Sequence, residues 1–460
     1  MVKYGSKIIG TGICVDKTPI ENSEFEDRIF IDAEGENYKD DAGIVKSTKT
    51  ILNELTNVTG IERRRYSPDM LTSELGTKAT LDGLNSSKKT PSDLDLIIFA
   101  HNFGDVTELG KSYDFVSSFA SKIKKGLGIS DPEILAYDII PGQTWNQNLL
   151  KEIPGKKILV IYGGDETSYS ERIFRDAKAK YDDSIEKDKI GAIVYIHNGI
   201  ECLAEKTGKN LGANNPKLVT FDLLFGCPGW LESMIHADYL LKTHGFKLGS
   251  IIGAERLSKV IDIFDRDGPI YSDGGGMTLI ERVGFDESAG IISSVSKSFS
   301  DYEPLLKMGP SYNAQWGNGR QFLKMDGSAL YKAVIEEIPK VMKECIDKSG
   351  LSYEDVFKFV MHQANNNMDE KTLMRTFDLY GVKRREFKEK DIGGLRMPMT
   401  IRDLANNSVA TQVIMLHFLI NGNAKEYGVG LGDHRINRGD VINLTSMGAG
   451  VNGNSALLKY

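Results

Sequence analysis

The chain of 460 residues is longer than one ordinary domain, so we expect two or three packed units around a large core. Its 57 basic and 64 acidic residues leave a net charge of −7, which argues against general binding of nucleic acid. No apolar run approaches the ~20 residues that span a bilayer, and the first residues lack the apolar stretch of a signal peptide, so we expect a cytoplasmic protein that does not enter a membrane. The four cysteines show no metal-ligand spacing, which predicts neither a disulfide framework nor a metal site.

Strands that alternate with helices run through the first 290 residues and predict an α/β fold. The segment 94–100 (LDLIIFA) is a near-continuous apolar run, which is typical of a strand buried in a parallel sheet. A helix is expected to begin near Ser73, and the acid-rich segment from 14 to about 48 indicates a long surface insertion. The other expected strands are 7–13, 134–140, 157–162, 221–225 and 248–253.

The pattern starts again at Ile291 and passes through an irregular stretch, 301–319. Apolar residues at helical spacing then predict a long amphipathic helix over 328–348. The later elements are expected to be a strand at 357–362, helices at 368–380 and 408–420, and a strand at 441–444. The chain therefore divides into an N-terminal half, 1–290, and a C-terminal half, 291–460.

Two stretches of the N-terminal half resemble each other. Residues 121–145 (SKIKKGLGISDPEILAYDIIPGQTW) resemble 204–230 (AEKTGKNLGANNPKLVTFDLLFGCPGW), and the offset from Asp138 to Asp222 is 84 residues. Gln143 stands where the second copy has Cys227, so only the second copy carries a thiol at this place. The region from about 138 to 221 is an extra unit, which is either a degenerate tandem copy or an unrelated α/β insertion with the same order of elements.

Cys227 occupies the turn between the strand 221–225 and the helix that follows it. Gly226 permits a tight turn there, and Pro228 suits the first position of a helix. A thiol at a helix N-terminus faces unpaired N–H groups that favour the thiolate, so we expect a pKa below the free value of ~8.5. Cys227 is a candidate nucleophile, although a buried structural cysteine fits the same local pattern.

Three further motifs lie in the C-terminal half. His362 ends the strand 357–362, Asn406 precedes an apolar helix, and GAGVNG (448–453) forms a glycine turn between two strands. Taken alone, His362 fits a surface histidine, Asn406 fits a helix cap, and the glycines indicate only a tight turn. Together with Cys227 they follow strands or precede helices, which is where α/β sheets bind ligands.

In order and spacing, these motifs resemble those of the β-ketoacyl-acyl-carrier-protein synthase III family, within the thiolase superfamily. The matches run, in order, through IIGTGICV, TGIERRR, DLDLIIFAH, FDLLFGCPGW, GAERLSKVIDIFDRDGPIYSDGGGMTLIE, MHQANNNM, NNSVAT and NLTSMGAGVNG. The resemblance implies a thiolase-like, five-layered αβαβα fold of two similar halves, usually a homodimer, that catalyses decarboxylative Claisen condensation. It does not explain the extra unit.

The resemblance also implies a role for each candidate residue. Cys227 would accept an acyl group as a thioester. His362 matches the histidine of the HQAN motif and Asn406 the asparagine of the family's Gly-Asn-Thr-Ser stretch, and their N–H groups would hold the enolate oxygen that forms when a malonyl-type extender loses carbon dioxide. The backbone N–H groups of Cys227 and Ala449 would hold the later oxyanion. His362 has to be neutral for this role, so we expect an apolar pocket that lowers its pKa.

The chain departs from the family pattern near the expected substrate entrance. Family members that prime with coenzyme A carry a tryptophan and an arginine just before the TGI turn, where this chain has Glu54 and Val58. No bound cofactor is expected, and the substrates would be acyl-coenzyme A or acyl-carrier-protein thioesters, but Glu54 and Val58 argue against a coenzyme A primer.

An acyl carrier protein is the expected partner, and its acidic surface would be steered by positive charge. Asn367 replaces the basic residue that the family uses in the HQAN helix, and Lys371 and Arg375, one and two turns further on, are the substitutes we expect. The basic cluster with Arg63 and Arg64 is a second candidate, although an exposed surface run is its simpler interpretation.

Three functions are open from the sequence. The first is a condensing enzyme of specialised fatty acid or polyketide biosynthesis, and the second is an acyltransferase that passes the acyl group from Cys227 to a hydroxyl, an amine or a carrier. The third is a non-catalytic partner subunit of a heterodimer. His362 and Asn406 favour condensation because simple transfer forms no enolate, and Cys227 argues against the partner role.

Overall fold

The larger of two main sheets contains eight strands in a computed structural model, which describes residues 4–112, 116, 118–150, 156–163, 190–284 and 289–460. The strand β4 (Leu96–Ala100) is buried at every residue and runs parallel to both of its neighbours, as the apolar run in the sequence predicts. In spatial order the strands are β1 (Tyr4–Cys14), β10 (Asp273–Gly284), β9 (Leu248–Arg256), β4, β8 (Val219–Leu224), β5 (Leu135–Pro141), β7 (Ile190–Ile196) and β6 (Lys157–Tyr162).

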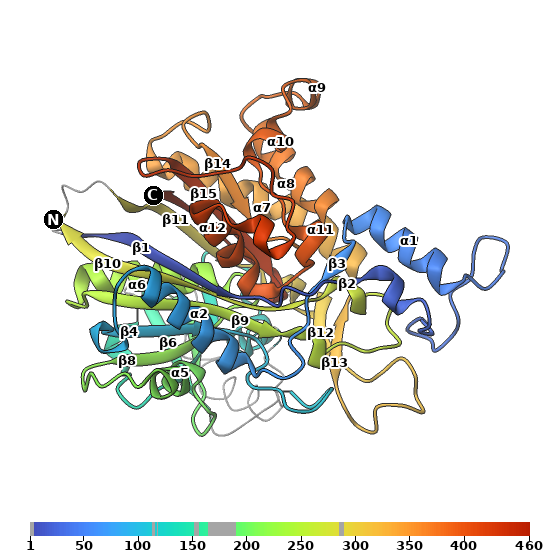
Figure 1. Cartoon of the computed structure of the whole chain (residues 1–460), viewed down its shortest axis with the longest axis horizontal. Coiled ribbons are helices and arrows are strands. Elements are labelled where there is room, and N and C mark those ends of the chain that lie inside the picture. Colours follow the sequence, from blue (N-terminus) through green and yellow to red (C-terminus); the bar gives the residue numbers. More distant parts are fainter. Residues whose placement is uncertain (1–3, 113–115, 117, 151–155, 164–189, 285–288) are drawn as a thin grey trace.

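The second main sheet comes from the C-terminal part of the chain. Its order is β11 (Gly290–Ser298), β16 (Asn452–Lys459), β15 (Val441–Gly448) and β14 (Lys358–Met361). In Figure 1 the orange β14 and the red β15 lie above the strands of the larger sheet, which include the blue β1 and the green β8. Two of the candidate site motifs are attached to this sheet, since His362 follows β14 and the glycine turn follows β15.

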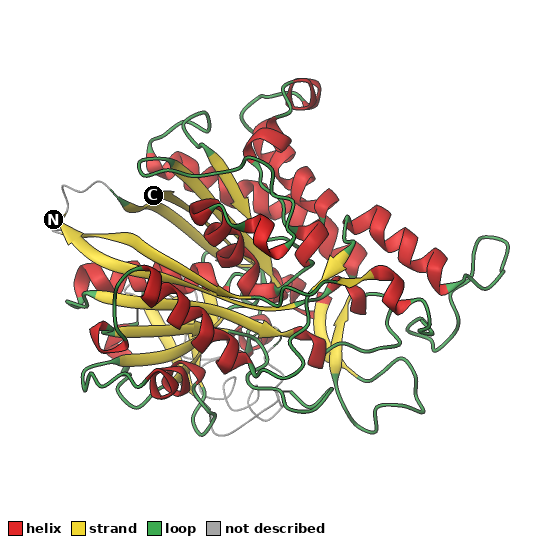
Figure 2. Cartoon of the chain, viewed as in Figure 1, coloured by secondary structure: helices red, strands yellow, loops and turns green. Residues whose placement is uncertain are grey.

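Helices form the remaining layers (Figure 2). Between the sheets, α6 (Gly229–Thr243) and α12 (Thr411–Asn421) contact strands of both. The outer face of the larger sheet carries α2 (Thr72–Ser86), α3 (Phe119–Gly126) and α5 (Leu203–Leu211), and the smaller sheet carries α7 (Gly327–Ser349), against which α8 (Asn366–Asp378) packs. This order is the expected five-layered αβαβα fold.

The two central helices are apolar on nearly all sides. Most residues of α6 are buried, including Trp230 and Leu231, and α12 is buried from Thr411 to Leu419. A helix covered by sheets on two faces needs apolar side chains around its whole circumference rather than on one stripe. Because α6 begins next to Cys227 and α12 follows Asn406, this buried layer fixes the position of two candidate site residues.

The remaining elements are shorter. The insertion before α1 (Thr48–Thr59) is mostly exposed loop, and the expected helix at 408–420 starts instead with a 3₁₀ turn, Ser408–Ala410. The other strands are β2 (Ile20–Glu21), β3 (Arg63–Arg64), β12 (Leu306–Gly309) and β13 (Phe322–Met325), and the other helices are α9 (Arg384–Glu389), α10 (Ile392–Arg396) and α11 (Ile401–Leu404). Among the described residues, we find no helix with the length and apolar character needed to cross a membrane.

A buried aspartate joins strand and helix in the second copy of the sequence repeat. Asp222 on β8 accepts the backbone N–H groups of Leu203 and Ala204, at the start of α5, at 2.7 Å each. His101, which follows β4, places its Nε2 3.1 Å from the same carboxylate. A charged acceptor at a helix N-terminus satisfies N–H groups that have no partner within the helix.

The first copy repeats this arrangement. Asp138 on β5 accepts the backbone N–H groups of Phe119 and Ala120, at the start of α3, at 2.7 and 2.9 Å. His197, which follows β7, places its Nε2 3.0 Å from the Asp138 carboxylate. The two copies therefore share their strand, helix and aspartate, and each aspartate meets a histidine from a neighbouring strand that lies outside the repeated stretch.

The copies meet along β5 and β8, which pair antiparallel in a reciprocal register. Asp138 lies opposite Leu224, and Ile140, which corresponds to Leu224, lies opposite Asp222. Such reciprocity is the property of an isologous interface, here formed within one chain. This reciprocity supports the tandem copy over an unrelated insertion.

The same pairing bears on the expected homodimer. Since β8 already has β4 on one edge and β5 on the other, a homodimer would need a surface other than β8.

Candidate active site

Four predicted site residues from distant parts of the chain line one cavity of about 1060 Å³. Cys227 comes from the turn after β8, His362 from the end of β14, Asn406 from the segment after α11, and Ala449 from the turn after β15. The carboxyl ends of strands from both main sheets therefore converge on one place, as the sequence motifs predict.

Cys227 sits in the strand-to-helix turn that the sequence indicates. Gly226 has φ of 70°, a left-handed conformation that glycine adopts readily, and α6 begins two residues after the cysteine. The glycine turn packs tightly against it, because a β-carbon on Gly226 would lie 2.9 Å from the carbonyl oxygen of Ala449. Glycine is therefore required by both the backbone conformation and the space.

The predicted low pKa of Cys227 is wrong in direction. Burial raises the pKa of the thiol to about 11, and the Glu255 carboxyl acts in the same direction. The Ser408 hydroxyl and the backbone N–H groups of Cys227 and Ala449 act to lower it. The helix N-terminus suggested a thiolate, but loss of hydration at the sulfur outweighs these donors. Cys227 is thus a thiol in the resting enzyme.

His362 has the environment that its predicted role requires. The side chain is 2 % exposed, its backbone N–H donates to Thr445 O at 2.8 Å, and its Nδ1 has no hydrogen-bond partner among the described residues. Burial lowers the pKa of the imidazole to about 3. The expected lowering is confirmed, and His362 is neutral over the physiological range.

Asn406 is held by its backbone and by one side-chain oxygen. Its N–H donates to Ile270 O at 3.0 Å, and its Oδ1 accepts the backbone N–H of Ser408 at 2.8 Å. The residues on either side of the asparagine pair, Ala405 and Ser408, have φ of 52° and 51°, which is unusual for residues other than glycine. With Oδ1 occupied, the Nδ2 amide is the group that Asn406 can offer to the cavity.

Three further polar residues near the thiol are absent from the sequence prediction. Ser408 Oγ donates to Cys227 Sγ at 3.3 Å, and Asn102 Nδ2 donates to Ser408 Oγ at 3.1 Å. The same Nδ2 group donates to Glu255 Oε1 at 2.7 Å. Ser408 could have been suspected from the sequence because it lies two residues after Asn406. Asn102 and Glu255 could not, since only the pairing of β4 with β9 brings them to the site.

The inner wall of the cavity is apolar, and its outer part carries charges of both signs, with the basic Arg266 and Lys332 beside acidic residues. Glu54 and Val58 both line it, and Glu54 forms an ion pair with Lys46 at 2.8 Å. Asp32 and Glu34 of the insertion line the same outer part. The apolar lining includes Phe103, Val116, Leu257, Ile270, Leu306 and Leu323. Such a cavity suits an acyl chain inside, and the carboxylates of Glu54, Asp32 and Glu34 disfavour an anionic group placed directly beside them.

Lys371 and Arg375 lie on α8, the helix that follows His362. Lys371 is half-buried, and Arg375 is exposed but donates from Nη1 to Ile335 O on α7 at 3.0 Å. Asn367 is exposed and its Nδ2 donates to Val58 O at 2.8 Å, which ties α8 to α1 at the cavity. Neither Lys371 nor Arg375 lines the cavity, and their role in docking stays a prediction.

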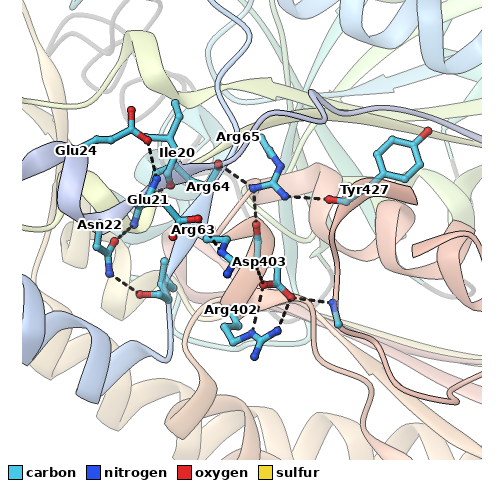
Figure 3. A network of polar contacts seen from close by, with 12 residues as sticks. Ile20, Glu21, Asn22, Glu24, Arg63, Arg64, Arg65, Arg402, Asp403 and Tyr427 are labelled. Atoms are coloured by element: carbon cyan, nitrogen blue, oxygen red, sulfur yellow. Dashed lines mark hydrogen bonds and ion pairs between the residues drawn. The ribbon is translucent and has the colours of Figure 1, made fainter. Parts of the chain in front are cut away.

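Arg64 cannot belong to a docking surface, so that prediction is wrong. Its side chain is 0 % exposed and donates to Pro269 O at 3.1 Å. It also donates to Ile20 O at 3.2 Å and to Asn22 Oδ1 (Figure 3). Charged groups remain buried when hydrogen bonds replace their hydration, and the three acceptors around this guanidinium do so. A run of arginines in the sequence does not reveal this burial.

Arg63 is partly exposed but already paired. Its Nε lies 2.9 Å from Glu21 and its Nη1 3.4 Å from Asp403, while Arg65 is buried against Asp403 O and Tyr427 O (Figure 3). The cluster therefore ties β3 to α11 and to the segment around Tyr427. These contacts hold the fold together. They also occupy the positive charges of the cluster, so it offers little free charge for binding a carrier protein.

Comparisons with known proteins agree with this geometry. The model of the family described as 3-oxoacyl-[acyl-carrier-protein (ACP)] synthase III matches residues 221–299. A β-ketoacyl-[acyl-carrier-protein] synthase III of Prochlorococcus marinus is 30% identical over 267 residues, which cover 56% of this chain and 70% of the relative. The protein of the same description from Erythrobacter litoralis is 27% identical over 71% of this chain and 94% of the relative.

Solved structures support the fold. The crystal structure of 3-oxoacyl-[acyl-carrier-protein] synthase III from Aquifex aeolicus has a TM-score of 0.61 and 20% identity, and covers 99% of this chain and 100% of that chain. The enzyme of Pseudomonas aeruginosa has a TM-score of 0.59 and 14% identity, with 99% and 98% covered.

Proposed function

Because this chain belongs to the β-ketoacyl-[acyl-carrier-protein] synthase III family, we propose that it condenses an acyl thioester, loaded on Cys227, with a malonyl-type carrier-protein thioester. One observation carries the proposal: a thiol, an imidazole, a carboxamide and a glycine turn from separate segments line one cavity. Bringing such groups to one reacting centre is a large part of what a catalyst does.

The first step is transfer of the acyl group to Cys227. The Cys227 sulfur attacks the thioester carbonyl, a new S–C bond forms, and the bond to the donor sulfur breaks. The proton of the Cys227 thiol leaves with the departing thiolate, so no net charge is created. The raised pKa of the thiol means that this proton must move during the step, because little free thiolate exists beforehand.

The second step is loss of carbon dioxide from the malonyl group. The electrons of the broken C–C bond form an enolate, whose oxygen accepts hydrogen bonds from neutral His362 and from Asn406 Nδ2. A neutral imidazole suits this role, since a cation would hold the malonyl carboxylate and oppose its loss as uncharged carbon dioxide. The low pKa of His362 keeps it neutral.

The third step joins the two carbon chains. The enolate carbon attacks the Cys227 thioester, and the oxyanion of the tetrahedral intermediate accepts the backbone N–H groups of Cys227 and Ala449. Both groups already lie close enough to Cys227 Sγ to lower its pKa. Collapse of the intermediate releases the β-ketoacyl product and the Cys227 thiolate, which takes a proton from solvent. Removal of one oxyanion donor typically costs about 10²- to 10³-fold in rate.

The substrates follow from the cavity. Its apolar inner wall suits an aliphatic or aromatic acyl group, and the carboxylates of Asp32, Glu34 and Glu54 disfavour the phosphates of coenzyme A beside them. We therefore take a carrier-protein thioester as the preferred donor, and acyl carrier protein as the partner. We also place the enzyme in the cytoplasm, as a homodimer whose contact avoids the occupied edges of β8.

Mass spectrometry of the intact chain tests the loading step. After incubation with an acyl-carrier-protein thioester, we expect one acyl adduct, located on Cys227 by peptide mapping and absent from Cys227→Ala. Cys345→Ala, which removes a buried cysteine outside the cavity, is the matched control and should load normally. No adduct on the wild-type chain would favour the partner-subunit role. An adduct that never leads to carbon dioxide release would favour simple acyl transfer.

A further inference from the structure

Ser408, Asn102 and Glu255 form a buried hydrogen-bond chain that ends at the sulfur of Cys227. The links are Ser408 Oγ to Cys227 Sγ at 3.3 Å, Asn102 Nδ2 to Ser408 Oγ at 3.1 Å, and Asn102 Nδ2 to Glu255 Oε1 at 2.7 Å. The side chains of Ser408, Asn102 and Glu255 are 6 %, 4 % and 0 % exposed. None of the three has a part in the steps proposed above.

The chemistry of the groups fixes the direction of every hydrogen bond in this chain. An amide nitrogen can only donate, so the Ser408 oxygen must accept from Asn102. The single hydroxyl hydrogen of Ser408 is then left for another acceptor, and the Cys227 sulfur is the acceptor within reach. Ser408 is therefore held as a donor toward the sulfur.

Glu255 fixes which end of the Asn102 amide faces Ser408. Its Oε1 accepts from Nδ2, and the Asn102 backbone N–H also donates toward this carboxyl. With Nδ2 bonded to Oε1, the same nitrogen faces Ser408, whereas the opposite amide orientation would present Oδ1 to the Ser408 hydroxyl and turn it away from the sulfur. Asn102 Oδ1 has no hydrogen-bond partner among the described residues, so no other contact of the amide competes with this orientation.

The backbone of Ser408 is strained in a way that serves this contact. Its φ of 51° is left-handed, and its N–H donates to Asn406 Oδ1 at 2.8 Å. Non-glycine residues in such conformations cost of order 1–3 kcal/mol and cluster at functional sites. Here the strain places the hydroxyl over Cys227 and the Asn406 carboxamide beside it.

We propose that Ser408 is a third donor to the Cys227 thiolate, alongside the backbone N–H groups of Cys227 and Ala449, and that Asn102 and Glu255 are positioning residues that hold it in the donating orientation. This inference rests on the proposed role of Cys227 as the nucleophile. The thiolate exists when the thiol loses its proton during loading and again when the product leaves, and Ser408 stabilises the charge on both occasions. Burial raises the pKa of the Glu255 carboxyl to about 8, so its charge opposes the thiolate mainly above that pH.

The test is the rate of Cys227 alkylation by iodoacetamide between pH 6 and 10, which needs no thioester or carrier protein. Loss of a hydrogen bond to a charged group costs about 10- to 100-fold in thiolate population, and the more basic thiolate that remains is a better nucleophile, so Ser408→Ala should alkylate about 3- to 15-fold more slowly at fixed pH. In this variant a given alkylation rate should be reached only at a higher pH than in the wild type. This result does not depend on condensation: the proposed function could be wrong while Ser408 still activates the thiol, and Ser408 could prove unimportant in a working condensing enzyme.

Two variants separate the hydroxyl from the strain and from general damage. Ser408→Gly removes both the hydroxyl and the left-handed strain, and should lower the alkylation rate as much as Ser408→Ala does. Thr411→Val is the matched control, because Thr411 is buried one turn further on and its Oγ1 has no hydrogen-bond partner among the described residues. Its profile should equal that of the wild type.

A double substitution tests whether Asn102 acts through Ser408. Asn102→Ala should also slow alkylation, and adding it to Ser408→Ala should cause no further loss, since the two residues serve one contact. Wild-type rates in both Ser408 variants would overturn the role of Ser408. Additive losses in the double variant would overturn the role of Asn102, and an equal shift in Thr411→Val would reduce both to general packing effects.

Discussion

Gly448 lies so close to Cys227 that a β-carbon on the glycine would come within 2.5 Å of the Cys227 backbone nitrogen and 2.7 Å of its Cβ. The φ of Gly448 is −176°, an extended conformation open to any residue, so space alone excludes a side chain here. This contact brings the glycine turn after β15 against the cysteine turn after β8. It is what allows backbone N–H groups of both turns to face one sulfur.

Gly448→Ala should therefore separate the two turns. We expect acyl loading to fall by about 10²-fold, since Ala449 would lose its place as a donor, with a loss in the free energy of unfolding of ~1–3 kcal/mol from overpacking. Single-turnover loading and urea unfolding measure the two effects. Gly284→Ala is the control, because a β-carbon there meets nothing within 4 Å. Normal loading in Gly448→Ala would show that the contact is not needed.

Glu255 should make stability depend on pH. Its pKa is raised from 4.5 to about 8, so between these values the native state keeps a proton that the unfolded chain has lost. The contribution of Glu255 to the free energy of unfolding is then complete below about pH 4.5, falls by up to ~1.4 kcal/mol per pH unit as pH rises, and levels off above about pH 8. Glu255→Gln cannot ionise and should remove this fall.

Urea unfolding of the wild type and Glu255→Gln at pH 5, 7 and 9 measures this difference. Other groups also titrate in this range, including His362 in the unfolded chain, but they are common to both proteins and cancel. Glu62→Gln, an exposed carboxylate, should leave the pH dependence as it is in the wild type. Parallel curves for the wild type and Glu255→Gln would contradict the raised pKa.

Decarboxylation should not follow the usual titration of a histidine. Because the pKa of His362 is lowered to about 3, the imidazole stays neutral from pH 8 down to about pH 5. Carbon dioxide release from malonyl-carrier protein by the acylated enzyme should then show no inflection near pH 6.5. An inflection at that pH, absent from His362→Ala, would mean that His362 is more hydrated than its burial indicates.

The charge of Glu54 should set the preference between thioester donors. Glu54→Arg replaces a negative by a positive charge in the outer cavity and should lower KM for an acyl-coenzyme A about 3- to 10-fold at low salt with kcat unchanged. The gain should shrink at high ionic strength. Glu62→Arg makes the same charge change outside the cavity and should have a smaller effect. Equal effects of the two variants would mean that overall charge, not the entrance, governs the affinity.

The extra unit should support the fold without entering the reaction. Asp138→Ala removes the acceptor of two helix N–H groups and the partner of His197, and we expect a loss of ~2–4 kcal/mol in the free energy of unfolding. The loading rate per folded molecule should not change. Asp131→Ala, which removes an exposed carboxylate seven residues before Asp138, should affect neither quantity. A selective loss of loading in Asp138→Ala would give the unit a catalytic part.

Local patterns in the sequence were sufficient for several strands and for the candidate nucleophile, whereas β7 and β10 of the larger sheet were not predicted. The apolar run 157–162 predicts β6 with its observed bounds, and Gly226 with Pro228 places Cys227 between a strand and a helix. These features depend on neighbours in the chain. The motifs around His362 and Asn406 were found through family resemblance, because neither residue is distinctive by its local pattern.

Features that depend on contacts between distant segments could not be predicted. The burial of Arg64 depends on Pro269, and the contact of Ser408 with Cys227 spans 181 residues. The direction of the Cys227 pKa shift was wrong because the sequence shows the helix N-terminus but not the loss of hydration. The repeat was visible in the sequence, whereas the antiparallel pairing of its copies required the register of β5 and β8.

The division of labour between the thiol and the two neutral donors is tested most directly by measuring both partial reactions in His362→Ala. Acyl loading would be followed by mass spectrometry and carbon dioxide release by labelled malonyl-carrier protein, with Asn406→Ala in parallel. We predict that both variants load Cys227 at measurable rates and release carbon dioxide at least 10²-fold more slowly than the wild type. Equal loss of the two partial reactions, or carbon dioxide release at the wild-type rate, would contradict the account.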